Sequence, residues 1–483
     1  MSIAGDASAA AGAPIRSAGA ASQQKQKISQ PYVAGWDDVI GADEKRAQER
    51  FLPVTRYALI DRLTRPQAWP PGMADDVRRL FRYLDYWRQQ NHNAQLMRLL
   101  RDYEPFAPDS DLFITRGYTE AERGRLQVQL REGIESLLQQ ANFVHVERER
   151  IEQVILTKDS YYGLDLNVDF QVFEELVIYY RGASVRTEQR RVLSRFMRKQ
   201  EFTIPIFRRI CMMFKLKDEA RHVEDVARQL RISREEARKR VRRSRALIAP
   251  GVSANCIYIK LFKNLPRADI EMVFPNTEVK FRLRDKLWLS LTGSGALGTG
   301  LFGAAGKLAV AFSSPFAAIM AAGALGSVVV RQVANVINQK QRYLSTMAQN
   351  LYFHAIASNS GVLTTLAEGA AEEDFKEEIL LYSVLAKENV NVRDLGAVDE
   401  AIEHYLANTF GIEVDCDVTD AYTRLKADGL VSEAPDGTLH ALPPKEAAAF
   451  IDSRWDKVLD MLPDDDEPPT GHEVDQQGAP AET

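Results

Sequence analysis

The residues best suited to a specific chemical role are a cluster of basic side chains. Between Arg228 and Arg245, nine arginines or lysines stand against only two acids, Glu235 and Glu236, so the local charge balance is +7. Cationic groups at this density attract polyanions such as nucleic acids or anionic lipid headgroups. The candidate polyanion contacts are Arg234, Arg238, Lys239, Arg242 and Arg243.

The same stretch resembles a helix-turn-helix. The apolar residues of 226–232, followed by Ser233, fit a first helix and a turn, after which a second helix would present the basic residues to DNA. Two positions depart from the motif, because Arg231 stands where glycine is usual and Arg240 where an apolar residue is expected. We therefore place a solvated charged helix first, an anionic-lipid contact second and DNA third, and nucleic acid is not a favoured partner.

A second group of mixed charges follows an apolar run. Lys263, Arg267, Asp269 and Glu271 lie around Pro266. Opposite charges beside a proline need local partners, and an ion-paired turn supplies them without any chemistry. Because no nucleophile, base and orienting group can be assembled from the sequence, we favour an ion-paired turn over a catalytic site and a non-enzyme over an enzyme.

Two glycine patterns resemble nucleotide-binding loops and fail their next requirement. Residues 293–298 have the Gly-x-Gly-x-x-Gly spacing, but the next acid is Glu368, far beyond the ~20 residues expected for a ribose contact. Gly306-Lys307 precedes a leucine, where a phosphate loop needs Ser or Thr. The three cysteines and seven histidines show no ligand spacing. We expect no cofactor and no metal.

The longest acid-free stretch runs from Lys286 to Ala367. It contains two uncharged segments, 287–306 with 20 residues and 308–330 with 23 residues. At about 1.5 Å per residue, helices of these lengths reach roughly 30 and 35 Å, enough to cross a bilayer core. The sequence therefore predicts a two-helix transmembrane hairpin at 286–331, with a lipid bilayer as partner. A pair of helices buried in a large soluble core is the alternative.

Small residues in the two segments have the spacing that lets membrane helices approach closely. The predicted packing positions are Gly295, Thr299, Gly303, Ala322 and Gly326. A homo-oligomer is left open, because the same spacing suits contacts between copies. Basic residues precede the first segment (282–286) and follow the second (331–342). Under the positive-inside rule, both termini are expected on the cytoplasmic side of a bacterial inner membrane, or inside an organelle.

The length and composition predict several domains. The chain has 483 residues, of which 45% are apolar, and its net charge of −5 excludes a protein that is basic over its whole surface. The predicted fold class is mainly α with an α+β part. We expect a disordered N-terminus (1–30), a mainly helical domain (31–145), an α+β domain with a charged helical insertion at about 217–255 (146–285), the hairpin (286–331), a helical connector (332–372), a winged-helix-like domain (373–462) and an acidic disordered tail (463–483).

Local patterns refine two of these parts. In the α+β domain, 176–182 predicts a buried strand and turn, and the apolar residues of 204–214 are spaced as on a helix. In the winged-helix-like domain, the candidate recognition region 413–428 has five acids against two basic residues, which phosphate would repel. We therefore expect this domain to contact a protein, whose identity the sequence does not give.

Several separated stretches resemble one family. They are Tyr179-Tyr180-Arg181-Gly182, Ile204-Pro205-Ile206-Phe207-Arg208-Arg209, residues 258–272, Asn350-Leu351-Tyr352-Phe353 and Glu377-Glu378-Ile379-Leu380-Leu381-Tyr382. Over about 150–450 the chain is similar to the domain-of-unknown-function family that contains the mitochondrial transmembrane protein 143. Residues 260–271 are the most specific part, and the charged stretch 217–255 departs from the family pattern. The resemblance implies a membrane protein without an established activity.

The sequence as a whole predicts a membrane-anchored adaptor or scaffold with soluble domains on one face of the bilayer. A membrane-tethered nucleic-acid-binding protein that uses 226–245 is one alternative, and an enzyme of unknown reaction is the other.

Overall fold

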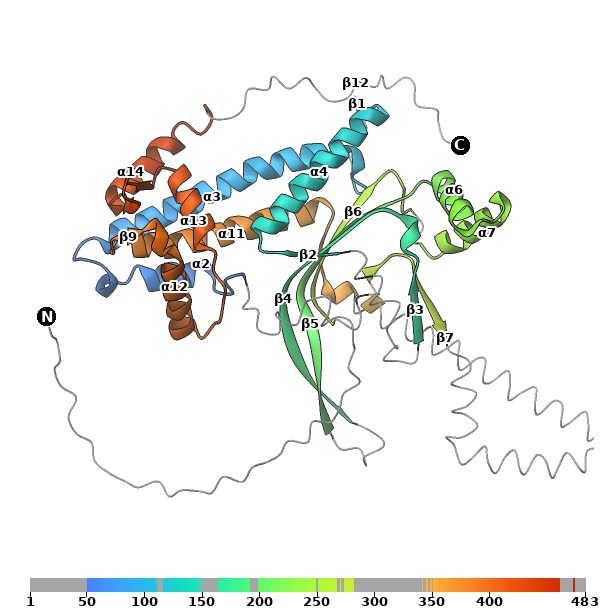
Figure 1. Cartoon of the computed structure of the whole chain (residues 1–483), viewed down its shortest axis with the longest axis horizontal. Helices are drawn as coiled ribbons and strands as arrows, with labels where there is room; N and C mark the ends of the chain where they lie inside the picture. The colour runs from blue at the N-terminus through green and yellow to red at the C-terminus, as the bar shows by residue number, and fades with distance from the viewer. Residues whose placement is uncertain are drawn as a thin grey trace, which may run out of the picture.

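Helices and an antiparallel sheet are mixed in the computed structural model of the chain (Figure 1). The structure describes residues 50–110, 116–147, 151, 164–191, 199–248, 251–266, 270, 273–281, 341, 345, 348–349, 351–460 and 472–473.

A five-stranded antiparallel sheet lies at the centre, with strand order β2-β4-β5-β6-β8. Its strands are β2 (Val144–Val146), β4 (Phe173–Arg191), β5 (Lys199–Leu216), β6 (Ile257–Pro266) and β8 (Ala355–Ser358). β4 and β5 continue together past the other strands as a two-stranded ribbon that points away from the helices (Figure 1). Two further antiparallel pairs join β3 (Leu164–Val168) to β7 (Thr277–Phe281) and β1 (Arg116–Gly117) to β12 (His472–Glu473).

Where β4, β5 and β6 pair beneath the helices, both faces of the sheet are buried, which explains the nearly continuous apolar sequence of residues such as 210–214 and 257–262. On β5, Cys211 and Met213 belong to the core on one face, whereas Ile210 and Met212 belong to the core on the other. Helices cover the first face. They are α3 (Ala74–Tyr103), α4 (Glu120–Gln140) and the start of α11 (Ser360–Leu385).

Two local predictions are wrong. Residues 204–214 form part of strand β5, because an apolar run that is buried on both faces lacks strict alternation and imitates a helical stripe. β4 does not turn at its expected end but continues through Gly182, whose φ of +71° lies in the left-handed region that glycine tolerates. A Cβ at Gly182 would lie 3.2 Å from the Cβ of Arg208 on β5.

The C-terminal unit has the element order of a winged helix. The end of α11 is followed by β9 (Val390–Asn391), α12 (Leu395–Phe410), α13 (Val418–Ala427), β10 (Val431–Glu433) and β11 (Thr438–Ala441). The strands form a sheet of order β10-β11-β9. Helices α2 (Arg56–Leu63) and α14 (Pro444–Trp455) complete this end of the molecule, and α14 packs against α3.

Two long helices connect the C-terminal unit to the sheet. The last turns of α3 and the first turns of α11 lie in the core above the sheet, with Leu99 and Leu366 as examples. The other ends of the same helices lie in the core of the C-terminal unit, through Leu80 and Ile379. Because each helix enters both apolar cores, the middle of α3 and the middle of α11 form the junction between the cores.

The predicted fold class is wrong. The described fold mixes helix and sheet around a five-stranded antiparallel sheet, whereas the sequence predicted a mainly α protein with a transmembrane hairpin. The sheet was missed because its strands come from distant parts of the chain, from 144–146 to 355–358, and are buried on both faces.

No helix in the described part of the chain is both long and apolar enough to cross a bilayer. This finding contradicts the predicted transmembrane hairpin and the integral-membrane location with both termini on one side. The two segments 287–306 and 308–330, with their predicted packing positions Gly295, Thr299, Gly303, Ala322 and Gly326, lie outside the described residues. A lack of charge is necessary for a span but does not make a helix, and each glycine in a helix interior costs about 1 kcal/mol relative to alanine.

The core above the sheet gives a stability prediction. Leu130 on α4 is fully buried there, so Leu130→Ala is expected to lower the free energy of unfolding by about 2–5 kcal/mol. Val128, two residues earlier on α4, is 46% exposed, and Val128→Ala should cost less than about 1 kcal/mol. Urea unfolding followed by circular dichroism measures both, and equal losses in the two variants would contradict the packing described.

Candidate functional site

The basic stretch forms a helix pair inserted between two neighbouring strands, β5 and β6. The pair consists of α6 (Glu219–Leu230) and α7 (Arg234–Arg245). Arg231 ends α6 in the left-handed conformation, with φ of +52°, and Ser233 begins α7 by accepting a hydrogen bond from the Glu236 N–H at 3.2 Å. The connection is therefore the tight turn of a helix-turn-helix, and Arg231 takes the backbone conformation that glycine usually supplies.

A small apolar core holds the two helices together. It contains Val223 and Val226 from α6 and Ala237 and Val241 from α7, with Ala227 and Ile232 packed against it. Ala237 is 0% exposed and Val241 is 1% exposed. Because these are the only apolar residues of α7, the outward face of this helix is polar and charged throughout.

Four of the five candidate polyanion contacts are exposed cations without an ion pair among the described residues. They are Arg238, Lys239, Arg242 and Arg243. The fifth, Arg234, lies 3.4 Å from Glu224, and Arg240 lies 3.7 Å from Glu236. The first turn of α7 is therefore partly neutralised, and the free positive charge is concentrated in its later turns. Arg240 is exposed, so the polar residue at this motif position does not disturb the core of the pair.

Side-chain hydrogen bonds attach the C-terminal end of α7 to the rest of the molecule. The Ser244 hydroxyl donates a hydrogen bond to Asp169 at 2.6 Å, and the Arg245 guanidinium donates one to the Lys217 carbonyl. Lys217 in turn forms an ion pair of 2.9 Å with Asp225 on α6. These contacts give the charged face of α7 a defined orientation.

The predicted charged turn is only partly described. Lys263 is exposed on β6, opposite Arg209 of β5, and its carbonyl accepts a hydrogen bond from His354 Nδ1 at 2.7 Å. Arg267, Asp269 and Glu271 lie outside the described residues. Only Lys263 of the four is described, so the ion-paired turn stays a prediction.

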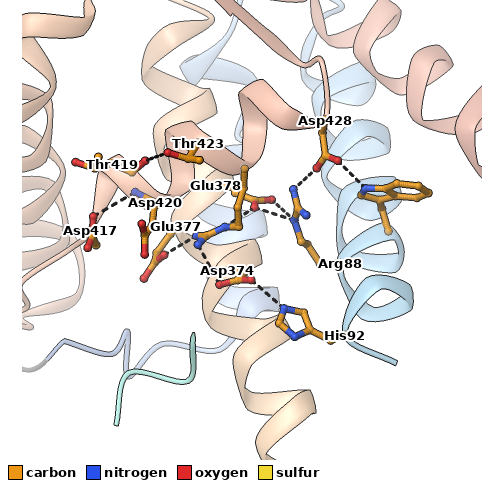
Figure 2. A network of polar contacts seen from close by, with 12 residues as sticks. Arg88, His92, Asp374, Glu377, Glu378, Asp417, Thr419, Asp420, Thr423 and Asp428 are labelled. Carbon is orange, nitrogen blue, oxygen red and sulfur yellow. Dashed lines mark hydrogen bonds and ion pairs between the residues drawn. The ribbon is translucent and has the colours of Figure 1, made fainter. Parts of the chain in front are cut away.

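Sequence reasoning missed a buried network of charges at the junction between the two cores (Figure 2). Glu378 of α11 is fully buried and accepts hydrogen bonds of 2.8 Å from Arg88 of α3 and from Arg424 of α13. Arg424 also forms ion pairs with Glu377 at 2.7 Å and with Asp374 at 3.2 Å. One buried row of carboxylates on α11 thus binds helices from both ends of the chain.

Further contacts extend the network at both sides. His92 Nε2 of α3 lies 2.9 Å from Asp374, and Arg88 pairs with Asp428 just after α13. The carboxylate of Asp428 accepts hydrogen bonds from Trp87 and from Arg454 of α14, both at 3.2 Å. Because the acids are engaged by cations or by the imidazole, the network is suited to holding helices rather than to acid-base chemistry.

The described residues contain one group of side chains that could hold a metal ion. Ligand oxygens of Asp399, Glu403 and Asp415 lie within 4.8 Å of one another. Burial, together with the neighbouring carboxylates, raises the pKa of Asp399 to about 6. One carboxylate oxygen of Asp399 is buried without a hydrogen-bond partner among the described residues. Asp399 itself is only half-buried and Asp415 is exposed, and exposed acidic groups are common without an ion.

Comparison with known proteins relates the centre of the chain to a family. Residues 173–361 match a family described as a protein of unknown function (DUF3754). The matched residues begin at β4 and end in the first turn of α11, so they include the helix pair and exclude the winged-helix-like unit. No solved structure matches the chain.

The central carboxylate of the network gives a second prediction. Glu378→Gln leaves the buried guanidinium groups of Arg88 and Arg424 short of a counter-charge, so we expect a loss of about 3–5 kcal/mol in the free energy of unfolding. Asp61→Asn is the control, because its pair with Arg78 is exposed and should contribute at most about 1 kcal/mol. Urea unfolding of both variants checks this, and a loss below 1 kcal/mol in Glu378→Gln would contradict it.

The network also predicts a pH dependence. Burial raises the pKa of Glu377 to about 8, although Arg424 lowers it in part. The folded protein then retains a proton that an unfolded glutamate, with a pKa of about 4.3, releases. This contribution to stability is therefore full below pH 4 and is lost as the pH rises towards 8. Glu377→Gln should flatten the fall of the urea midpoint between pH 5 and pH 8, and an unchanged slope would contradict this assignment.

Proposed function

We propose that the chain binds duplex nucleic acid through the exposed face of α7. The observation that carries the proposal is the set of four exposed, unpaired cations on a helix whose apolar residues are buried against its partner helix. The major groove of DNA admits an α-helix, and phosphate groups attract lysine and arginine from both of its edges.

The structure of the pair favours DNA over a lipid surface. A helix that inserts into a bilayer needs an exposed apolar face, whereas a DNA-binding helix needs a packed partner that holds it rigidly. On α7, Ala237 and Val241 are buried in the pair, so they are not available to a bilayer. Leu230 and Leu247, which are 45% and 41% exposed, lie at the ends of the pair and offer little apolar area. Binding to anionic lipid headgroups would be electrostatic only.

Contacts to the phosphate backbone are expected to dominate over contacts to bases. In a helix-turn-helix, the first residues of the second helix usually contact base edges. Here that first turn carries Glu235 and Glu236 beside a paired Arg234, while the free cations come later in α7. We therefore propose a contact with duplex backbone of low sequence selectivity, because phosphate contacts carry no sequence information directly.

The adaptor function is the second candidate, and the winged-helix-like unit supports it. On its helix α13, Thr419, Asp420 and Thr423 are exposed (Figure 2). Arg424 of the same helix forms an ion pair with the buried Glu378. Asp417 begins the helix by accepting a hydrogen bond from the Asp420 N–H at 3.2 Å. An outward face with carboxylates and without a free cation would repel phosphate, so a protein partner suits it better.

The finer family assignment is also a proposal. Residues 258–272 carry the motif through which the chain resembles the family that contains the mitochondrial transmembrane protein 143, and they lie within the matched range. That resemblance supplies no activity, so it favours neither candidate function.

The proposed function predicts a salt-dependent duplex affinity. Replacing Arg238, Lys239, Arg242 and Arg243 with Gln removes up to four phosphate contacts, and the slope of log K against log salt should fall by about 3.6, or 0.9 per contact. Fluorescence anisotropy with a labelled duplex at several salt concentrations measures this slope.

A matched variant distinguishes an effect of the α7 site from an effect of the protein's total charge. Arg79, Arg82, Arg98 and Arg125 are exposed on α3 and α4, and changing them to Gln removes the same four charges. That variant should keep most of the wild-type affinity. Equal losses in the two variants, or binding of the wild-type protein to anionic vesicles in preference to DNA, would overturn the proposal.

A further inference from the structure

A histidine is buried where the helix pair meets the body of the molecule. His222 on α6 is 1% exposed, and neither of its ring nitrogens has a hydrogen-bond partner among the described residues. Buried polar atoms in folded proteins almost always have a partner, so an imidazole with two unpartnered nitrogens calls for an explanation. His222 belongs to neither the exposed face of α7 nor the apolar core of the pair.

Charged groups on several neighbouring elements act electrostatically on this imidazole. They are Asp169 beside η4 (Phe170–Val172), Lys217 after β5, Asp225 on α6 and Arg245 on α7. Both carboxylates are already engaged, because Asp169 accepts from Ser244 and Asp225 pairs with Lys217. A proton on His222 would therefore place a third cation near Lys217 and Arg245. No carboxylate among the described residues accepts a hydrogen bond from the ring.

We propose that His222 is a proton-operated latch for the α6–α7 pair. The neutral imidazole packs between the helix pair and the part of the molecule that contains the five-stranded sheet, and the pair stays docked. The imidazolium is disfavoured in this buried position, so protonation loosens the docking. The regulatory role rests on the proposed function, because a loosened pair no longer presents α7 to a duplex in a fixed orientation.

The direction of the pH effect follows from the surroundings of the ring. Burial lowers the pKa of His222 from its ordinary value of about 6.5, and the charges of Arg245 and Lys217 lower it further. Asp169 and Asp225 raise the pKa in part, but the net direction is down. The docked state therefore binds fewer protons than the released state. Docking is complete above about pH 6.5, weakens as the pH falls from there to the lowered pKa, and changes no further below it. Since one proton is involved, the docking equilibrium changes at most about tenfold per pH unit.

Hydrogen exchange of the full-length protein tests the latch without any ligand. Amide protection of 219–245, corrected for the intrinsic exchange rate, should fall between pH 7.5 and pH 5.5 in the wild-type protein, while that of β5 and β6 stays constant. His222→Leu should remove most of this fall. His440→Leu, at an exposed histidine of β11, is the matched control and should behave as the wild type.

A second variant and a binding measurement complete the test. If His222→Leu loosens the pair at both pH values, His222→Phe restores a ring at this position and should give protection that does not change with pH. The latch is overturned if amide protection of 219–245 changes equally with pH in the wild-type protein and in whichever His222 variant keeps the pair docked.

Duplex affinity, measured relative to the pH-insensitive variant, should fall in the wild type at pH 5.5. If the ratio of wild-type to variant duplex affinity is the same at pH 7.5 and at pH 5.5, the regulatory role is overturned. A latch that operates in a protein with no duplex affinity supports the latch and overturns only the proposed function.

Discussion

Buried carboxylates on α11 hold together helices from three parts of the chain. A carboxylate such as Glu378 is stable in an apolar interior only when cations reach it with good geometry, since the loss of hydration costs several kcal/mol per ion. Here the cations come from α3 and α13, which lie before and after α11 in the chain. Apolar packing alone would allow these helices to slide or rotate, whereas the ion pairs are satisfied in one arrangement. The network thus fixes how the winged-helix-like unit sits relative to the sheet.

That arrangement also explains why two long helices join two apolar cores. α3 and α11 each contribute apolar residues to the core above the sheet and to the C-terminal core. The charged residues Arg88, His92 and Asp374 lie between these apolar sections. Replacing a buried ion pair with apolar residues often keeps or increases stability, so the role we assign to the network is to select an orientation.

The helix pair is independent of this junction. It has its own apolar core and is inserted between two adjacent antiparallel strands, a connection that tolerates added chain because it runs over the surface. The polar contacts that attach it include those of Ser244 with Asp169, of Arg245 with the Lys217 carbonyl and of Arg221 with Glu174. A surface module with few attachments can change its docking without disturbing the sheet, which suits both a binding function and its regulation by a proton.

Features that depend on neighbouring residues could be predicted from the order of amino acids. The helix pair, its turn at Arg231 and its concentration of positive charge follow from the order of residues in 226–245, because capping, the turn and a small core are all local. The helical character of the N-terminal region and the order of elements in the C-terminal unit follow from local periodicity in the same way.

Other features depend on residues that meet only in the folded chain. The strand of 204–214 was mistaken for a helix, because burial on both faces removes the alternation that identifies a strand. The uncharged segments 287–306 and 308–330 predicted a membrane span, whereas no helix in the described part of the chain is long and apolar enough for one. The partners Arg88 and Glu378 stand 290 positions apart. Nothing in the local sequence of either residue indicates the other, because a buried ion pair is specified only when the folded chain brings both groups out of water together.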